Sequence, residues 1–171
     1  MVPGKTNLLM SRANRLGLPL SHPAALIATG FGIGLLPKAP GTWASLATLP
    51  LGWLIAVELG PLGLAAAAAT AFAAGWWASA ITAKASGIVD PGFIVVDEIA
   101  AQLLILALAP VDWRFYLAAF LLFRLFDIWK PFPVNRLDRT IKGGFGIMLD
   151  DVAAAAYALT LIVIGRGAIG V

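Results

Sequence analysis

The acidic side chains of this 171-residue chain gather at the ends of apolar runs. Seven of the nine Asp and Glu residues lie in, or at the helix ends facing, two polar segments, 84–97 and 129–150. Carboxylates close to lipid are costly unless they pair with cations or bind a metal ion. Mg²⁺ prefers such hard oxygen ligands and often combines a few carboxylates with water and substrate phosphate. The candidate metal ligands and catalytic residues are Asp97, Glu98, Asp127, Asp150 and Asp151. Since Asp150 and Asp151 are about 100° apart on a helix, we expect one of them to face the metal.

Cations are interleaved with these acids in the segment "DIWKPFPVNRLDR", residues 127–139. Lys130 is a candidate catalytic cation, and "KGGFG" at 142–146 predicts flexible backbone N–H groups that could approach an anion. A second phosphate contact is predicted in "PKAPGTWAS" at 37–45, where a helix would begin with free N–H groups. The candidate substrate-binding residues are Lys38, Gly41, Thr42, Lys130, Arg136, Asp138 and Arg139.

Simpler structural roles for these residues stay open. Acids at helix N-termini stabilise the helix dipole, so "VDE" and "DD" could be caps. Asp127 could pair with Arg124 or Lys130, three residues away on either side. Basic residues beside a membrane can mark its cytoplasmic side and contact anionic lipid without doing any chemistry. Capping does not explain Asp127, which lies at a helix C-terminus, where the dipole disfavours an acid.

The composition indicates a membrane protein of a single domain, residues 1–171. Hydrophobic residues make up 60% of the chain, charged residues 12%, and the mean hydropathy is +0.90. The chain has no Cys and one His, His22, which excludes thiolate metal sites, a cysteine nucleophile and a site of several imidazoles. Residues 1–20 form a basic N-terminal tail with Lys5, Arg12 and Arg15, without the apolar run and cleavage site of a signal peptide.

The apolar runs predict an all-α fold, a helical membrane bundle of about four to five short transmembrane helices. Pro50 is expected to kink the first of these. A Gly-rich run at 23–36 favours a re-entrant or interfacial segment. The predicted spans are 43–59, 61–83, 98–109, 113–128 and 151–165.

The distribution of Lys and Arg orients the predicted bundle. With the N-terminus inside, five spans place 84–97 and 129–150 on the inner side, with ten Lys and Arg inside or at the inner interface and two, Arg114 and Arg166, outside. This bias follows the positive-inside rule. It predicts that the candidate site faces the cytoplasm.

Four blocks of sequence resemble the phosphatidylglycerophosphatase A family over residues 21–165: "GFGIGLLPKAPGTWASLATLP", "IVVDEIAAQLL", "FRLFDIWKPFPVNRLDR" and "GGFGIMLDDVAAA". The resemblance implies a bacterial inner-membrane, Mg²⁺-dependent phosphatase that converts phosphatidylglycerophosphate to phosphatidylglycerol. It gives functional weight to Pro40, Gly41, Thr42, Asp97, Glu98, Asp127, Lys130, Asp138, Arg139, Asp150 and Asp151.

The mechanism we expect is metal-assisted hydrolysis of a lipid phosphomonoester. Carboxylates would hold one or two Mg²⁺ ions that activate water, while Lys130 and Arg139 neutralise phosphoryl charge. An aspartate nucleophile is a second route. The alternative from another class is a small non-catalytic transporter or assembly protein with a charged cytoplasmic face, but the predicted span centres lack the ionisable groups of an ion path. The expected partners are the bilayer and a phospholipid substrate, with no nucleic acid; the sequence defines no oligomeric state.

Overall fold

The computed structural model describes residues 14–168, which form helices and no strand. The expected all-α fold is therefore confirmed for this part of the chain. The first 13 residues, with Lys5 and Arg12 of the basic tail, lie outside the described residues. The elements are η1 (Asn14–Leu16), α2 (Pro23–Ala28), η2 (Ile33–Leu35), α3 (Pro40–Ser86), α4 (Val96–Leu108), α5 (Trp113–Trp129), α6 (Val134–Thr140) and α7 (Gly143–Ala168).

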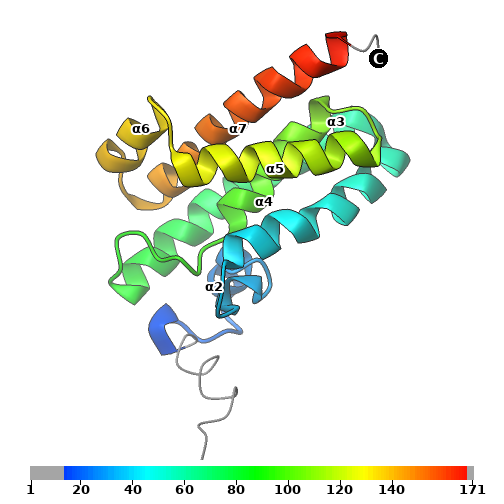
Figure 1. Ribbon diagram of the computed structural model, residues 1–171. Helices are drawn as coiled ribbons and strands as arrows, with labels where there is room; N and C mark the ends of the chain where they lie inside the picture. Colours follow the sequence, from blue (N-terminus) through cyan, green and yellow to red (C-terminus); the bar gives the residue numbers. More distant parts are fainter. Residues whose placement is uncertain (1–13, 169–171) are drawn as a thin grey trace, which may run out of the picture.

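The long helix α3 is broken at Gly60, where the backbone dihedrals (φ 67°, ψ −169°) are not helical. Glycine adopts positive φ without a Cβ penalty, and Pro61 suits the first position of the helix that follows. A Cβ built on Gly52 would lie 3.7 Å from Leu64 Cδ2, whereas a continuous helix would separate these residues by about 18 Å. The two halves, 40–59 and 61–86, therefore fold back on each other, as Figure 1 shows. They match the predicted runs 43–59 and 61–83, but the only non-helical residue is at Gly60, not at Pro50.

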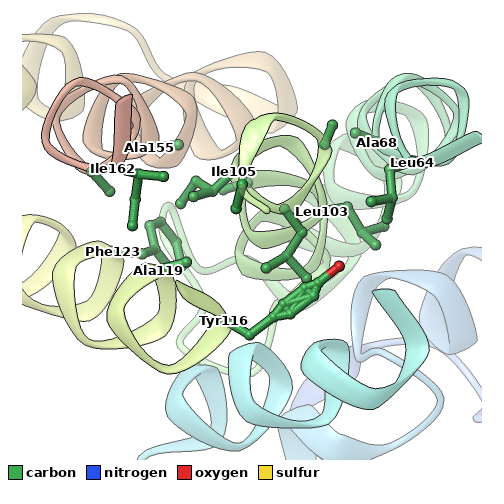
Figure 2. Packing of buried hydrophobic residues seen from close by; sticks show 14 of the residues in the cluster. Leu64, Ala68, Leu103, Ile105, Tyr116, Ala119, Phe123, Ala155 and Ile162 are labelled. Carbon is green, nitrogen blue, oxygen red and sulfur yellow. The ribbon is translucent and has the colours of Figure 1, made fainter. Parts of the chain in front are cut away.

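Helix α4 lies at the centre of the bundle and packs against α3, α5 and α7 (Figure 1). Most of its side chains are buried. Figure 2 shows buried side chains of α3, α5 and α7 packed against those of α4. Phe123 of α5 is fully buried beside α7. The core residues labelled there are Leu64, Ala68, Leu103, Ile105, Tyr116, Ala119, Phe123, Ala155 and Ile162.

Helix α7 begins at Gly143, eight residues before the predicted start at 151. The prediction of a flexible loop at 142–146 was thus wrong for 143–146. These glycines permit close packing instead: a Cβ on Gly144 would overlap the Trp76 carbonyl oxygen, and one on Gly146 would overlap the Ile141 carbonyl oxygen. A cluster of glycines in a sequence commonly predicts a loop. Here the glycines lie in a helix, and Gly144 lets α7 approach α3 closely.

Two helices, Pro40–Ser86 and Gly143–Gly167, are long and apolar enough to cross a membrane. The four to five spans expected from the sequence are not confirmed by this criterion, since α4 has 13 residues and α5 has 17. The Gly-rich run 23–36 contains only the six-residue α2 and the three-residue η2, both too short to span a bilayer.

The polar connections gather at one end of the bundle. The 87–95 and 130–142 connections lie there, and Gly17 of the N-terminal segment packs against the Ala85 carbonyl at the same end. The turn between the two halves of α3 and the 109–112 connection lie at the other end (Figure 1). The fold therefore brings the carboxylates of α4, α5 and α7 to a common end.

Phe123 tests the packing of α5 against the core. Its side chain is fully buried, so Phe123→Ala should lower the free energy of unfolding in detergent by about 3 kcal/mol. Leu125→Ala on the same helix is the control, because Leu125 is 53% exposed and its loss should change stability by less than about 0.5 kcal/mol. Equal melting temperatures of the two variants would contradict the packing described here.

Candidate functional site

A pocket of about 180 Å³ opens at the end of the bundle where the polar connections gather. It receives side chains from the first turn of α4, the last turn of α5, α6, the N-terminal turns of α7 and the 89–94 connection. The charged residues that line it are Asp90, Asp97, Glu98, Asp127, Lys130, Asp138, Lys142, Asp150 and Asp151.

Three of these carboxylates form a cluster. Asp97 and Glu98 extend from the first turn of α4 and Asp151 from α7, and one oxygen of each lies within 4.8 Å of the others. Glu98 Oε2 and Asp151 Oδ2 are buried without a hydrogen-bond partner among the described residues. Buried carboxylate oxygens of like charge repel one another unless a cation or a proton joins them. Their donor type and spacing fit a hard divalent cation such as Mg²⁺.

Arg124 of α5 holds the adjacent side of this cluster in place. Its Nη1 lies 2.6 Å from Asp127 Oδ2 and 3.6 Å from Glu98 Oε1. Asp127, a predicted metal ligand, thus lines the pocket as the ion-pair partner of Arg124 and not as a member of the three-carboxylate cluster. Our sequence interpretation considered Arg124 only as a partner of Asp127. The three-residue spacing could reveal that pair, but it could not reveal the contact with Glu98 on another helix.

Lys130 connects α5, α6 and α7. It caps α5 in the left-handed conformation (φ 46°), and its Nζ lies 2.6 Å from Asp150 Oδ2 and 3.2 Å from Asp138 Oδ1. Partial burial lowers the pKa of this ammonium, but the hydrogen bonds and charges of Asp150 and Asp138 outweigh that effect and raise the pKa above its ordinary value. Lys130 therefore stays charged at physiological pH, and its partners are these two acids and not Asp127.

Asp150 and Asp151 have different neighbours. Asp150 contacts Lys130, while Asp151 belongs to the cluster with Asp97 and Glu98. This is the geometry expected for adjacent residues on a helix, and it leaves one of the two beside the predicted metal position.

The N-terminus of α3 meets the cluster at Gly41. A Cβ there would overlap Glu98 Oε1, so only glycine allows the carboxylate to approach this closely. Glu98 thus occupies the positive end of the α3 dipole, which stabilises a nearby anion. The remaining predicted substrate-binding residues are not among those that line the pocket: Lys38, Arg136 and Arg139 are exposed, and Thr42 is half-buried.

Lys142 is a cation of the pocket that our candidate set omitted. It lines the pocket, and its Nζ donates a hydrogen bond to the Asp138 carbonyl oxygen at 2.6 Å. Its position directly before the glycines of α7 was the available signal, since the segment "KGGFG" placed it beside a predicted anion contact.

The fold and the site define an apolar helical bundle with a carboxylate-rich, lysine-containing pocket at one end. Comparison with known proteins narrows this class. A family model described as phosphatidylglycerophosphatase A matches residues 26–166, and the chain belongs to this family. It is 43% identical to phosphatidylglycerophosphatase A of Haemophilus influenzae over 146 residues, covering 85% of this chain and 90% of that protein. It is 38% identical to phosphatidylglycerophosphatase A of Escherichia coli, covering 85% of this chain and 84% of that protein. No solved structure matches the fold.

Gly41 offers a direct test of the contact between α3 and the cluster. Gly41→Ala should displace the Glu98 carboxylate and reduce phosphatase activity at least 10-fold, because small displacements of positioned groups cost about 10²-fold in rate. Gly165→Ala is the matched control, because Gly165 is also helical and nothing lies within 4 Å of a Cβ built on it. The Gly165→Ala variant should have the activity of the wild type. Full activity of Gly41→Ala would show that Glu98 need not hold this position.

Proposed function

We propose that the protein is a Mg²⁺-dependent lipid phosphatase that hydrolyses the terminal phosphomonoester of phosphatidylglycerophosphate to phosphatidylglycerol and phosphate. Membership of the phosphatidylglycerophosphatase A family supports the substrate. The observation that carries the mechanism is the cluster of Asp97, Glu98 and Asp151 with its two buried, unpartnered carboxylate oxygens.

The charge balance of the pocket supports the metal. Seven carboxylates and two lysines line it, so a phosphate dianion alone would be repelled. A divalent cation between carboxylates and phosphate would reverse this repulsion. When bound, Mg²⁺ would lower the pKa of a coordinated water and polarise phosphoryl oxygens.

The side chains have distinct roles in this proposal. Asp97, Glu98 and Asp151 would hold the metal, and Arg124 would keep Glu98 and Asp127 in place. Lys130 would donate a hydrogen bond to the phosphate and stabilise the charge that develops on it. We propose water as the nucleophile, because the site concentrates metal-type ligands and Asp127, Asp138 and Asp150 are already engaged by cations.

We also propose that the bundle spans the bacterial inner membrane four to five times, with the pocket on the cytoplasmic side. Exposed aromatic side chains support this placement, since Trp is enriched where membrane proteins meet the lipid–water interface. Such residues surround the pocket end of α3, α5 and the connection after α5: Trp43, Trp76, Trp77, Trp129 and Phe132. A lipid phosphate carried at that interface would be level with the pocket.

Removal of one carboxylate tests the metal site. Asp97→Asn should reduce turnover by at least 10²-fold and weaken Mg²⁺ activation, because a ligand charge is lost without loss of volume. Phosphate release from phosphatidylglycerophosphate would be measured across a Mg²⁺ titration and after EDTA treatment. Asp112→Asn at the opposite end of the bundle is the control and should be fully active. Wild-type turnover that persists in EDTA would refute the metal mechanism.

Membrane sidedness can be measured because the chain has no native Cys. Asp90→Cys and Thr140→Cys should react with an impermeant thiol reagent from the cytoplasmic side, and Arg114→Cys from the periplasmic side. All three positions are in loops or at helix ends, and Arg114 is at the end far from the pocket. Labelling of positions 90 and 140 from opposite sides would disprove the proposed topology.

A further inference from the structure

A second hollow lies directly beside the carboxylate pocket and shares two lining residues with it. It is lined by the C-terminal turns of α3 and the start of the following connection, and Val89 and Gly143 also line the carboxylate pocket. Its volume is about 350 Å³. The carboxylate pocket and this hollow therefore adjoin each other at Val89 and Gly143.

Lys84 is the charged residue that lines this hollow. Its side chain is exposed and forms no ion pair with a carboxylate of residues 14–168. The other cations at the pocket have partners: Lys130 contacts two carboxylates, and Lys142 contacts a backbone carbonyl. Lys84 thus offers an uncommitted ammonium beside an acid-rich pocket, which suits an anion that the pocket itself would not attract.

The α3 side of this hollow continues along the helix toward an apolar surface. Ala80 and Ala83 line it, and one turn earlier on α3 the exposed Trp76 and Trp77 follow. The Trp76 ring packs against Phe145 of α7 with centroids 5.0 Å apart. Tryptophan in this position is typical of the level at which lipid head groups give way to acyl chains.

We infer that the hollow around Lys84 is a binding subsite for the phosphodiester of the lipid substrate. The inference rests on the proposed function, in which the terminal phosphomonoester occupies the carboxylate pocket. Phosphatidylglycerophosphate carries its second phosphate on the far side of a short glycerol linker, and its diacylglycerol follows that phosphate. A path from the carboxylates past Gly143 to Lys84 and then to Trp76 presents a metal site, a cation and an apolar surface in that same order.

Arg15 is the competing cation. It lines another hollow that borders the pocket through Pro91 and Gly92, on the side of the N-terminal segment. That hollow is formed by the 88–93 connection and Arg15, and none of its lining residues belongs to α3 or α7. Arg15 therefore offers a positive charge beside the pocket, but its hollow does not extend along α3 or α7. Arg15→Ala serves as the control for Lys84→Ala.

The test compares two lipid phosphomonoesters in mixed micelles of a neutral detergent. Phosphatidylglycerophosphate has the phosphodiester and phosphatidic acid lacks it. Lys84→Ala should raise the KM for phosphatidylglycerophosphate about 10-fold, the usual loss for one charged contact, and leave kcat and the KM for phosphatidic acid within about twofold. Lys84→Arg should recover most of the loss, and Arg15→Ala should leave the ratio of the two KM values unchanged.

Each outcome decides the inference. Equal losses on both lipids for Lys84→Ala would reduce Lys84 to a contact with anionic interfaces and overturn the subsite. A changed ratio for Arg15→Ala, with none for Lys84→Ala, would place the phosphodiester at Arg15 instead. If the wild type hydrolyses phosphatidylglycerophosphate and Lys84→Ala has the same KM for this lipid, the subsite is refuted and the proposed function stands. A folded wild type that leaves this lipid intact refutes the proposed function and, with it, the inference.

Discussion

Repulsion among carboxylates held at the ends of apolar helices is the constraint on which the site depends. Two unit charges 4 Å apart repel by about 4 kcal/mol at an effective dielectric constant near 20. Asp97, Glu98 and Asp151 are separated by no more than 4.8 Å at their closest oxygens. A nearby cation or a bound proton relieves this repulsion in a folded protein. Arg124 supplies part of this compensation on the Glu98 side, and the remaining excess of negative charge would favour a divalent cation in the proposed metal site.

The position of Asp151 relative to Asp97 is set by close contacts away from the carboxylates. Gly144 brings the start of α7 against the backbone of α3 at Trp76, and Gly75 of α3 accepts the Met148 side chain one turn further along. These small residues allow the helices to approach closely, which is the main means of helix association in an apolar solvent. A larger side chain at either glycine would move α7 outward and separate its carboxylate from those of α4. The geometry of the site is therefore inseparable from the packing of α7 on α3.

The sequence predicted most of the helices, because long apolar runs determine helix positions locally. It also predicted that Asp97, Glu98, Asp127, Asp150 and Asp151 come to one end of the fold, since the order of polar and apolar segments fixes which helix ends meet. The failures concern contacts between helices. The glycines at 143–146 gave a loop signal, although their role in packing against α3 appears only in three dimensions. In the same way, spacing along the chain suggested a Lys130–Asp127 pair, whereas Lys130 turns at the end of α5 toward residues of α6 and α7.

Lys130 shows how one cation can stabilise the fold and still act on a phosphate. An ammonium group has three N–H donors, and Asp150 and Asp138 account for two of them. A phosphate oxygen could accept the third without breaking either ion pair. The two acids would then fix the direction of the free donor, so that little side-chain entropy is lost when the substrate binds. A guanidinium has a planar fork in place of this tetrahedral arrangement, and it could not satisfy two carboxylates from different helices and a third acceptor in the same geometry. The two ion pairs are thus compatible with a catalytic role, because they orient the lysine without using all of its hydrogen-bonding capacity.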